Sequence, residues 1–342
     1  MALATKKDVW LKVAIPVAIG LAVVAYLFVS EFDSSALARL TFDWHTCGAI
    51  ALCLLFVVGR DFGLTWRFHT ITDGSLTWRR ALRVDLMCAF TSAITPSAVG
   101  GSAFAIFYLN REGITVGRAT VLTLTTLFLD ELFFVIFCPL LVLLMPDAGL
   151  FGEGSNPVMA GIQTVFWLVY AGIVIWTAIL FVGILLKPLW TQRMLLALFS
   201  LRWLRRWRGN IERMTDNMLA TSDWVKGRSR RWWLKVFGAT TLSWASRYLV
   251  VNALFAGFVP AASALLVFGR QFIVWVVLMV SPTPGGSGIS EWLFTTYYGD
   301  LIGDMSMVLI IAMVWRLLTY YLYLVTGVCL APSYFTSKNT KK

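Results

Sequence analysis

Six long apolar stretches constrain this chain more than any other feature of its sequence. They cover residues 11–29, 44–64, 119–145, 162–186, 236–259 and 305–330, and each is close to the ~20 residues that a helix needs to cross a membrane. Only 14% of the residues are charged, against about 25% in an ordinary soluble domain. These observations exclude a water-soluble globule and predict an all-α polytopic membrane protein with six spanning helices. The first stretch lacks a small-residue cleavage site, so we expect a retained anchor rather than a signal peptide.

Two further apolar regions, residues 81–110 and 261–299, are interrupted midway by proline and glycine. If both are re-entrant hairpins and the amino terminus is cytoplasmic, nearly all lysines and arginines outside the membrane fall on the cytoplasmic side. The outer loops then hold a single basic residue, Arg39, and seven carboxylates, which is the distribution of the positive-inside rule. The charges therefore predict two oppositely oriented re-entrant hairpins, with both termini in the cytoplasm.

The order of the predicted elements repeats itself upside down. Each half reads span, span, hairpin, span, so residues 1–150 and 160–330 would form a 4+4 inverted repeat within a single transmembrane domain of residues 1–342. The segment Pro96-Ser-Ala-Val-Gly-Gly-Ser102 in the first hairpin is similar to Pro282-Thr-Pro-Gly-Gly-Ser287 in the second. Inverted repeats with broken helices are how many transporters form a binding site near the bilayer midplane.

The two hairpin tips are therefore a predicted site. Irregular backbone survives at membrane depth only where it packs against protein or lines a wet cavity. Beyond each tip the chain resumes as a helix whose unpaired N–H groups favour an anion, and we expect Ser102 and Ser287 to supply the N-caps. The tip residues predicted to bind substrate are Gly100, Gly101, Ser102, Gly285, Gly286 and Ser287. In the alternative, Pro and Gly merely kink two long helices.

Ionisable side chains inside the membrane are the other candidates, because each costs about 2.5 to 3.5 kcal/mol at mid-bilayer. The predicted set is Asp130, Glu131, Arg247, Arg270, Glu291 and Arg316. Arg270 and Arg316 are either structural counter-ions or ligands of a phosphate, which suits the guanidinium fork. We expect a carboxylate from another helix to pair with Arg247.

The carboxylates of this set also have alternatives. Asp130 and Glu131 lie about 100° apart on a helix, so we expect one to face a shared chamber and the other a neighbouring helix. Glu291 falls in the first turn of the helix after the second tip, where the dipole favours a carboxylate. It either caps that helix or serves as a proton carrier or a ligand for a cationic head group.

Three patches resemble a known family. They are Thr95-Pro-Ser-Ala-Val-Gly-Gly-Ser102, Ser281-Pro-Thr-Pro-Gly-Gly-Ser-Gly-Ile-Ser-Glu291 and Trp315-Arg-Leu-Leu-Thr-Tyr-Tyr321. They look like the flippase-like transmembrane family typified by the membrane region of lysylphosphatidylglycerol synthases, the multiple peptide resistance factors. The family motif maps onto Pro284, Gly285, Gly286, Gly288, Glu291 and Arg316.

The resemblance implies movement of a phosphate-bearing lipid, or of a lipid-linked head group, between the leaflets of a bacterial inner membrane. The full synthases also carry a soluble acyltransferase-like domain, and the longest predicted cytoplasmic segment, residues 187–235, is too short to build one. We therefore expect no enzymatic activity. An intramembrane lipid-modifying enzyme and a transporter of small soluble anions remain as alternatives.

The basic connector of residues 187–235 suggests a helix at the membrane surface. Its Leu201-Arg-Trp-Leu-Arg-Arg-Trp-Arg208 run alternates apolar residues with arginine, which suits the head-group zone better than a nucleic-acid partner. Anionic or phosphate-bearing membrane lipids are thus the expected partners, and a homo-oligomer is left open. The sequence shows no cofactor or metal motif, since its five cysteines lie in apolar stretches without a C-x-x-C and it has two histidines.

Overall fold

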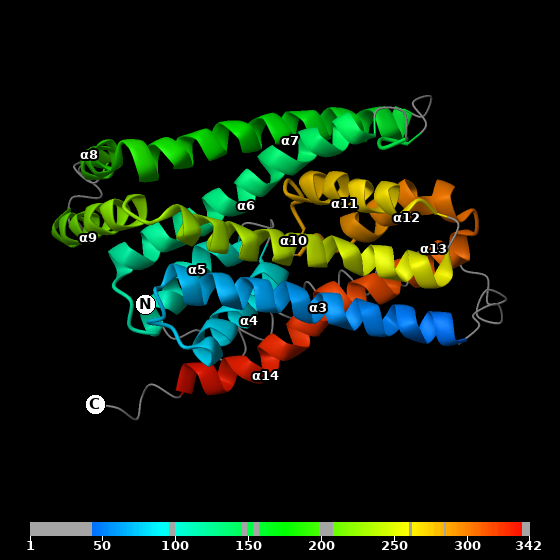
Figure 1. Ribbon diagram of the computed structural model, residues 1–342, viewed down its shortest axis with the longest axis horizontal. Coiled ribbons are helices and arrows are strands. Elements are labelled where there is room, and N and C mark those ends of the chain that lie inside the picture. The colour runs from blue at the N-terminus through cyan, green and yellow to red at the C-terminus, as the bar shows by residue number, and fades with distance from the viewer. Residues whose placement is uncertain are drawn as a thin grey trace.

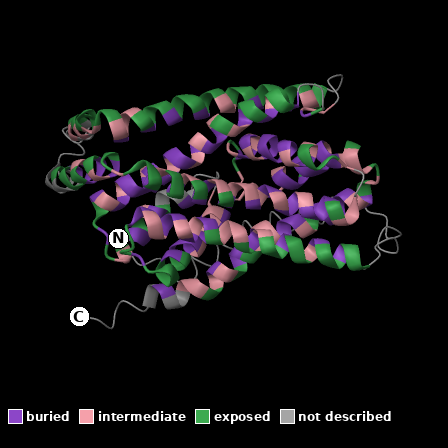
Figure 2. Cartoon of the chain, viewed as in Figure 1, coloured by how far each residue is buried: buried purple, intermediate pink, exposed green. Residues whose placement is uncertain are grey.

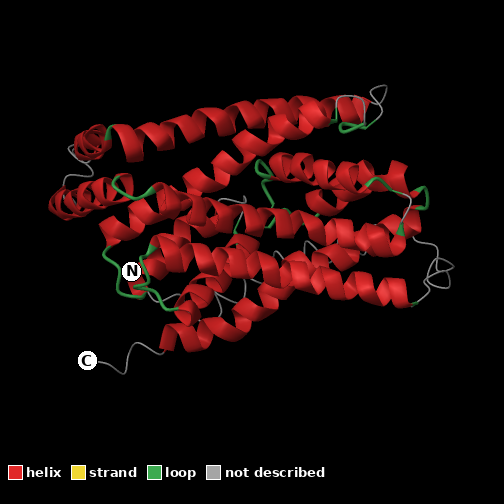
Figure 3. Ribbon diagram, in the orientation of Figure 1, coloured by secondary structure: helices red, strands yellow, loops and turns green. Residues whose placement is uncertain are grey.

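The computed structural model describes residues 43–95, 100–145, 149–152, 157–198, 208–259, 262–283 and 285–336. Within these ranges every regular element is a helix (Figure 3). In chain order they are α3 (Trp44–Ile71), α4 (Trp78–Ile94), α5 (Gly100–Arg111), α6 (Val116–Leu144), α7 (Pro157–Phe181), η1 (Val182–Leu186), α8 (Pro188–Leu198), α9 (Arg208–Lys226), α10 (Arg230–Phe258), α11 (Ala264–Leu278), α12 (Ile289–Ile302), α13 (Met305–Arg316), η3 (Leu317–Tyr321) and α14 (Leu322–Thr336).

Four of the described helical segments are long and apolar enough to cross a membrane. They are Trp44–Ile71, Val116–Leu144, Pro157–Leu186 and Met305–Ala331, and they correspond to four of the six predicted spans. The predicted span at residues 236–259 corresponds to the later part of α10 and its C-cap Val259. This helix is long enough to cross, with 29 residues, but it is not among the four. The predicted span at residues 11–29 lies outside the described residues. The chain is thus an all-helical multi-pass membrane protein.

Helix α3 is longer than the sequence predicts. The expected span ends at residue 64, whereas the helix continues to Ile71. The Asp43 carboxylate caps its start by accepting a hydrogen bond of 2.9 Å from the Thr46 N–H, which holds the pKa of Asp43 below its ordinary value. Arg67, which follows the predicted span, therefore lies on α3 together with Arg60.

The centre of the bundle is the antiparallel pair α3 and α10, which run side by side along the long axis (Figure 1). Small residues let the two backbones approach closely. A Cβ atom on Gly63 would lie 2.8 Å from both the Ala239 carbonyl oxygen and the Ser243 nitrogen, and one on Gly59 would lie 2.8 Å from Ser246 Oγ. Small residues at helix interfaces drive association within membranes through close packing.

Two pairs of short helices occupy opposite halves of the long axis (Figure 1). Helices α4 and α5 pack together, and their outer ends lie near the last turn of α14, where Arg111 Nη2 donates to the Tyr334 carbonyl oxygen at 2.8 Å. Helices α11 and α12 pack together at the other end, beside residues 149–152. The inner ends of both pairs meet in the middle of the bundle.

Many large apolar side chains on the long helices are exposed. Helix α7 is largely exposed (Figure 2), with Leu168 70% and Ile175 61% exposed. An apolar face of this extent on a helix of membrane-crossing length is suited to contact with lipid. The connector folds into α8 and α9 at one end of the molecule, although residues 199–207 lie outside the described ranges.

Candidate functional site

A cavity of about 220 Å³ lies where the two short helix pairs meet. Its walls come from α3, α4, α5, α6, α10 and α11, from the turn at Gly285 and Gly286, and from α13, η3 and α14. Its charged lining consists of Arg60, Arg67, Asp85, Asp130, Arg247 and Arg316. Charged side chains inside a membrane protein normally face a partner or a wet cavity. This cavity is therefore the candidate site.

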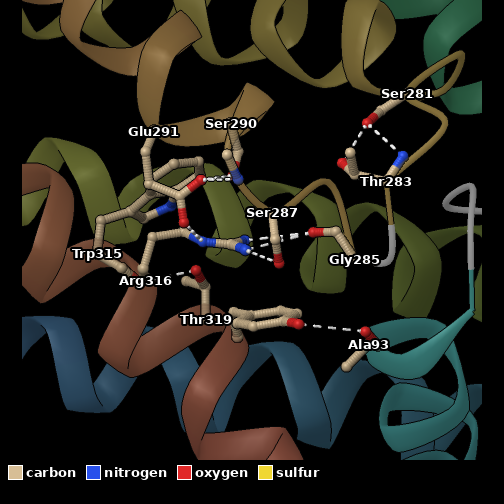
Figure 4. A network of polar contacts seen from close by, with 12 residues as sticks. Ala93, Ser281, Thr283, Gly285, Ser287, Ser290, Glu291, Trp315, Arg316 and Thr319 are labelled. Carbon is tan, nitrogen blue, oxygen red and sulfur yellow. Dashed lines mark hydrogen bonds and ion pairs between the residues drawn. The ribbon is translucent and has the colours of Figure 1, made fainter. Parts of the chain in front are cut away.

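One wall is built on a buried ion pair between α12 and α13 (Figure 4). Arg316 Nε donates to Glu291 Oε1 at 2.7 Å, and both side chains are buried. The other carboxylate oxygen, Oε2, accepts from the Gly288 N–H at 2.8 Å and from Ser290 Oγ at 2.7 Å. Glu291 thus caps the start of α12 and neutralises Arg316 at once.

The terminal nitrogens of the Arg316 guanidinium bind the turn before α12. Its Nη2 donates to Ser287 Oγ and to the Gly285 carbonyl oxygen, each at 3.4 Å. The guanidinium also lies over the Tyr320 ring, 4.0 Å from the ring centroid, an arrangement that favours a cation. Since Gly288 precedes the first helical residue, the expected N-cap role of Ser287 is wrong, and Ser287 binds Arg316 instead.

The turn before α12 also touches the end of α4 directly. The Gly285 N–H donates to the Thr95 carbonyl oxygen at 3.3 Å, and Tyr320 Oη donates to the Ala93 carbonyl oxygen at 3.3 Å (Figure 4). Gly285 has a φ of +58°, and a Cβ atom there would overlap the Tyr320 ring. Glycine is therefore required both by the backbone and by the contact.

Two further ion pairs immobilise the arginines of α3. Arg67 Nη1 donates to Asp130 Oδ1 of α6 at 2.5 Å, and Trp244 Nε1 donates to the same oxygen at 2.8 Å. Arg60 pairs with its neighbour Asp61 at 2.5 Å, and its guanidinium lies 4.1 Å from the centroid of the Tyr323 ring.

Arg247 and Asp85 differ from the other charged residues of the cavity. The Arg247 guanidinium lies over two indole rings, 4.6 Å from the centroid of Trp244 and 4.5 Å from that of Trp275. Among the described residues it forms no salt bridge, so the expected carboxylate partner is not there. Asp85 is 2% exposed, and its Oδ2 has no hydrogen-bond partner in the described part of the chain.

The structure brings six of the predicted site residues to this cavity: Gly101, Asp130, Arg247, Gly285, Gly286 and Arg316. Glu291 and Ser287 reach it through Arg316. Glu131 does not line it, as the 100° separation from Asp130 on one helix allows. Gly100 and Ser102 lie at the start of α5, where Gly100 is already helical, so Ser102 is the third helical residue and not an N-cap.

Arg270 does not line the cavity, and its ion pair with Asp300 favours the structural counter-ion of the two alternatives. Its guanidinium reaches the last turn of α12, where Nη1 and Nη2 donate to Asp300 at 2.5 and 2.7 Å. The same two nitrogens donate to the carbonyl oxygens of Tyr297 and Gly149 at 2.5 and 2.9 Å. The residue is 2% exposed and ties α11 to α12 and to the segment after α6.

Three charged residues of the cavity, Arg60, Arg67 and Asp85, are not among the predicted site residues. Arg60 and Arg67 are two helical turns apart on α3, and Val57 and Leu64 share their face of the helix and line the cavity with them. That helical spacing was the available signal, and extending the span past residue 64 would have revealed it. Asp85 was readable as a buried charge, but its partners lie on other helices.

Comparison with known proteins gives one family. The family model described as the lysylphosphatidylglycerol synthase TM region matches residues 10–327. A relative named UPF0104 membrane protein, from Archaeoglobus fulgidus, is 22% identical over 326 residues, which cover 90% of this chain and 92% of the relative. No solved structure matches the chain.

Proposed function

Because the chain belongs to the family of lysylphosphatidylglycerol synthase transmembrane regions, we propose that it moves a phosphate-bearing lipid, or a lipid-linked head group, between the two leaflets of a bacterial inner membrane. Both termini would lie in the cytoplasm. The observation that carries the proposal is a cavity deep among membrane helices that is lined by four arginines, Arg60, Arg67, Arg247 and Arg316. The guanidinium fork of arginine is well suited to phosphate.

The proposed architecture is a 4+4 inverted repeat with two re-entrant hairpins, α4/α5 and α11/α12. The lengths of these helices support it, since they have 17, 12, 15 and 14 residues, and a crossing needs about 20. The positions of the two pairs in opposite halves of the long axis also support it (Figure 1). Helix α10 and residues 11–29 would supply the remaining two spans.

The proposed mechanism follows from how the hairpin tips meet. A cavity of about 220 Å³ has room for a head group, so the acyl or prenyl chains would stay in the surrounding lipid. The direct contact of Gly285 with Thr95 joins the two repeats at the cavity. Rocking of one repeat against the other would break and remake this contact and expose the head group to each side in turn.

The experiment is leaflet exchange in reconstituted vesicles. The purified chain is placed in vesicles containing lipids labelled on an acyl chain, anionic in one set and zwitterionic in another, and exchange is followed by quenching of the outer label. We expect exchange faster than in protein-free vesicles, and a reduction of about tenfold in Arg316→Gln, the loss of one charged hydrogen bond. The exposed Arg230→Gln on α10 is the matched control.

Exchange no faster than in protein-free vesicles for every lipid would contradict the proposal. An assay with an excess of labelled inorganic phosphate distinguishes a lipid translocase from a transporter of small soluble anions. A translocase keeps exchanging lipid, whereas an anion transporter accumulates labelled phosphate and exchanges no lipid.

A further inference from the structure

The charges of the cavity do not balance residue by residue. Three of its arginines are neutralised by a carboxylate in salt-bridge contact: Arg316 by Glu291, Arg67 by Asp130 and Arg60 by Asp61. Arg247 and Asp85 remain, and neither forms a salt bridge with any residue in the described ranges. Within the described ranges, one cation and one anion of the same cavity thus lack a salt-bridge partner of opposite charge.

Arg247 is fixed in place without being neutralised. Its guanidinium lies over Trp244 and Trp275, and Trp244 is itself tethered through Nε1 to Asp130. Stacking of this kind orients the guanidinium plane and uses its π-face, leaving the N–H groups at its edge for a ligand. A planar fork of N–H donors matches the oxygens of a phosphate.

Asp85 offers the opposite charge on the facing helix pair. It belongs to α4, is 2% exposed, and lines the same cavity as Arg247. The charged groups that act on it come from α3 and α10: Arg60, Asp61, Arg67 and Arg247. Two of these arginines already hold carboxylates. A buried carboxylate without a partner is costly, and an ammonium group with N–H donors would relieve that cost.

We infer that Arg247 and Asp85 read the head group, Arg247 binding a phosphate oxygen and Asp85 binding an ammonium, so that the preferred lipid carries one of each charge. The inference rests on the proposed translocase function and narrows its substrate class. A purely anionic head group would satisfy Arg247 and leave Asp85 unpaired. A purely cationic one would satisfy Asp85 and leave Arg247 unpaired.

The test compares a lipid whose phosphate head group carries an ammonium with one whose phosphate head group carries none. Phosphatidylethanolamine and phosphatidylglycerol, each labelled on an acyl chain, are exchanged by the wild-type chain in vesicles of otherwise neutral lipid. We expect the ethanolamine lipid to exchange about tenfold faster, the worth of one charge-assisted hydrogen bond. Asp85→Asn should remove that preference by slowing only the ethanolamine lipid. Arg247→Gln should slow both, and the exposed Asp223→Asn on α9 is the matched control.

Head-group binding supplies a measurement that does not depend on the folding of a variant. Soluble phosphoethanolamine should raise the unfolding temperature of the wild-type chain in detergent more than glycerol phosphate does at the same concentration. Equal stabilisation by the two compounds, or an Asp85→Asn variant that slows both lipids alike, would overturn the inference while leaving the translocase intact. Absence of any lipid exchange in the wild-type chain would instead overturn the proposed function, and with it the premise used here.

Discussion

At the scale of single residues, three of the four arginines that line the cavity form salt bridges with carboxylates. Arg316 and Glu291 illustrate the energetics, because both are buried and each satisfies the other. The net stabilisation from such a pair is small, since bringing two charges out of water offsets most of their attraction. Removing one partner is different, because it leaves the other charge buried alone.

A double-mutant cycle at this pair should reveal strong coupling. Arg316→Gln and Glu291→Gln should each lower the free energy of unfolding by about 3–5 kcal/mol, whereas the double variant should lose much less than the sum. Unfolding in mixed micelles titrated with SDS gives the three free energies. Strict additivity would mean that the two side chains are not coupled. Arg230→Gln, at an exposed position, should change little.

Gly285 gives a second test at this scale, with a built-in comparison. Gly285→Ala introduces both a left-handed alanine and an overlap with Tyr320, whereas Gly113→Ala introduces only the backbone strain, since Gly113 has a φ of +100° and nothing within 4 Å of its Cβ position. Strain of this kind costs of order 1–3 kcal/mol. We therefore expect Gly285→Ala to destabilise the protein and to slow lipid exchange. Gly113→Ala should destabilise it less and leave exchange intact.

At the scale of elements, the close contact of α3 with α10 sets the position of the cavity arginines. On α3, Arg60 directly follows the close approach at Gly59, and Arg67 lies one turn after the close approach at Gly63. Arg247 lies on α10. Any widening of this interface separates the two faces that carry them. The distance between α3 and α10 therefore affects both the packing of the bundle and the arrangement of the cavity arginines.

Two single alanine variants, one on each helix, test how closely α3 and α10 pack. Gly63→Ala places a methyl group 2.8 Å from the backbone of α10, whereas Gly238→Ala on α10 meets nothing within 4 Å. The first should destabilise the protein by about 1–3 kcal/mol through overpacking, and the second should be neutral or slightly stabilising. Thermal unfolding in detergent measures both. Equal effects would show that the two helices do not pack closely at Gly63.

The elements were easier to predict from the sequence than the contacts between them. Long apolar runs and the Pro-Gly breaks are local signals, so four spans and the interruptions of two helix pairs could be recognised. Pairing is not local. Arg270 and Arg316 look alike in the sequence, yet Arg270 forms a salt bridge with Asp300. The loop charges predict that Asp300 lies in an outer loop, where it would not pair with a buried arginine. Which guanidinium meets which carboxylate depends on helix rotation and tertiary packing.

At the scale of the whole molecule, the proposed topology assigns the two ends of the bundle to opposite sides of the membrane. The described cysteines happen to report on it. Cys47 and Cys329 are exposed, whereas Cys53 and Cys138 are buried. Cys47 lies in the first turn of α3, and Cys329 lies near the opposite end of the bundle in α14.

A membrane-impermeant maleimide should therefore label these two thiols from different sides. In intact cells we expect Cys47 to react, and in inside-out vesicles Cys329, with Cys47→Ser and Cys329→Ser identifying each signal by mass. The buried thiols of Cys53 and Cys138 serve as internal negatives until the protein is denatured. Labelling of both exposed thiols from one side would contradict the proposed orientation.

The wide helical turn η3 has a consequence for how this chain can change. A π-helical turn contains one residue more than an α-helical turn, and each residue rotates a helix by about 100°. Deleting one residue from Leu317–Tyr321 would therefore rotate α14 about its own axis by about 100°, whereas Arg316, which precedes the deletion, would keep its position. Tyr323 would then lose Asp61, to which it donates at 2.8 Å. The number of residues in η3, more than their identity, therefore sets how the faces of α13 and α14 are rotated relative to each other.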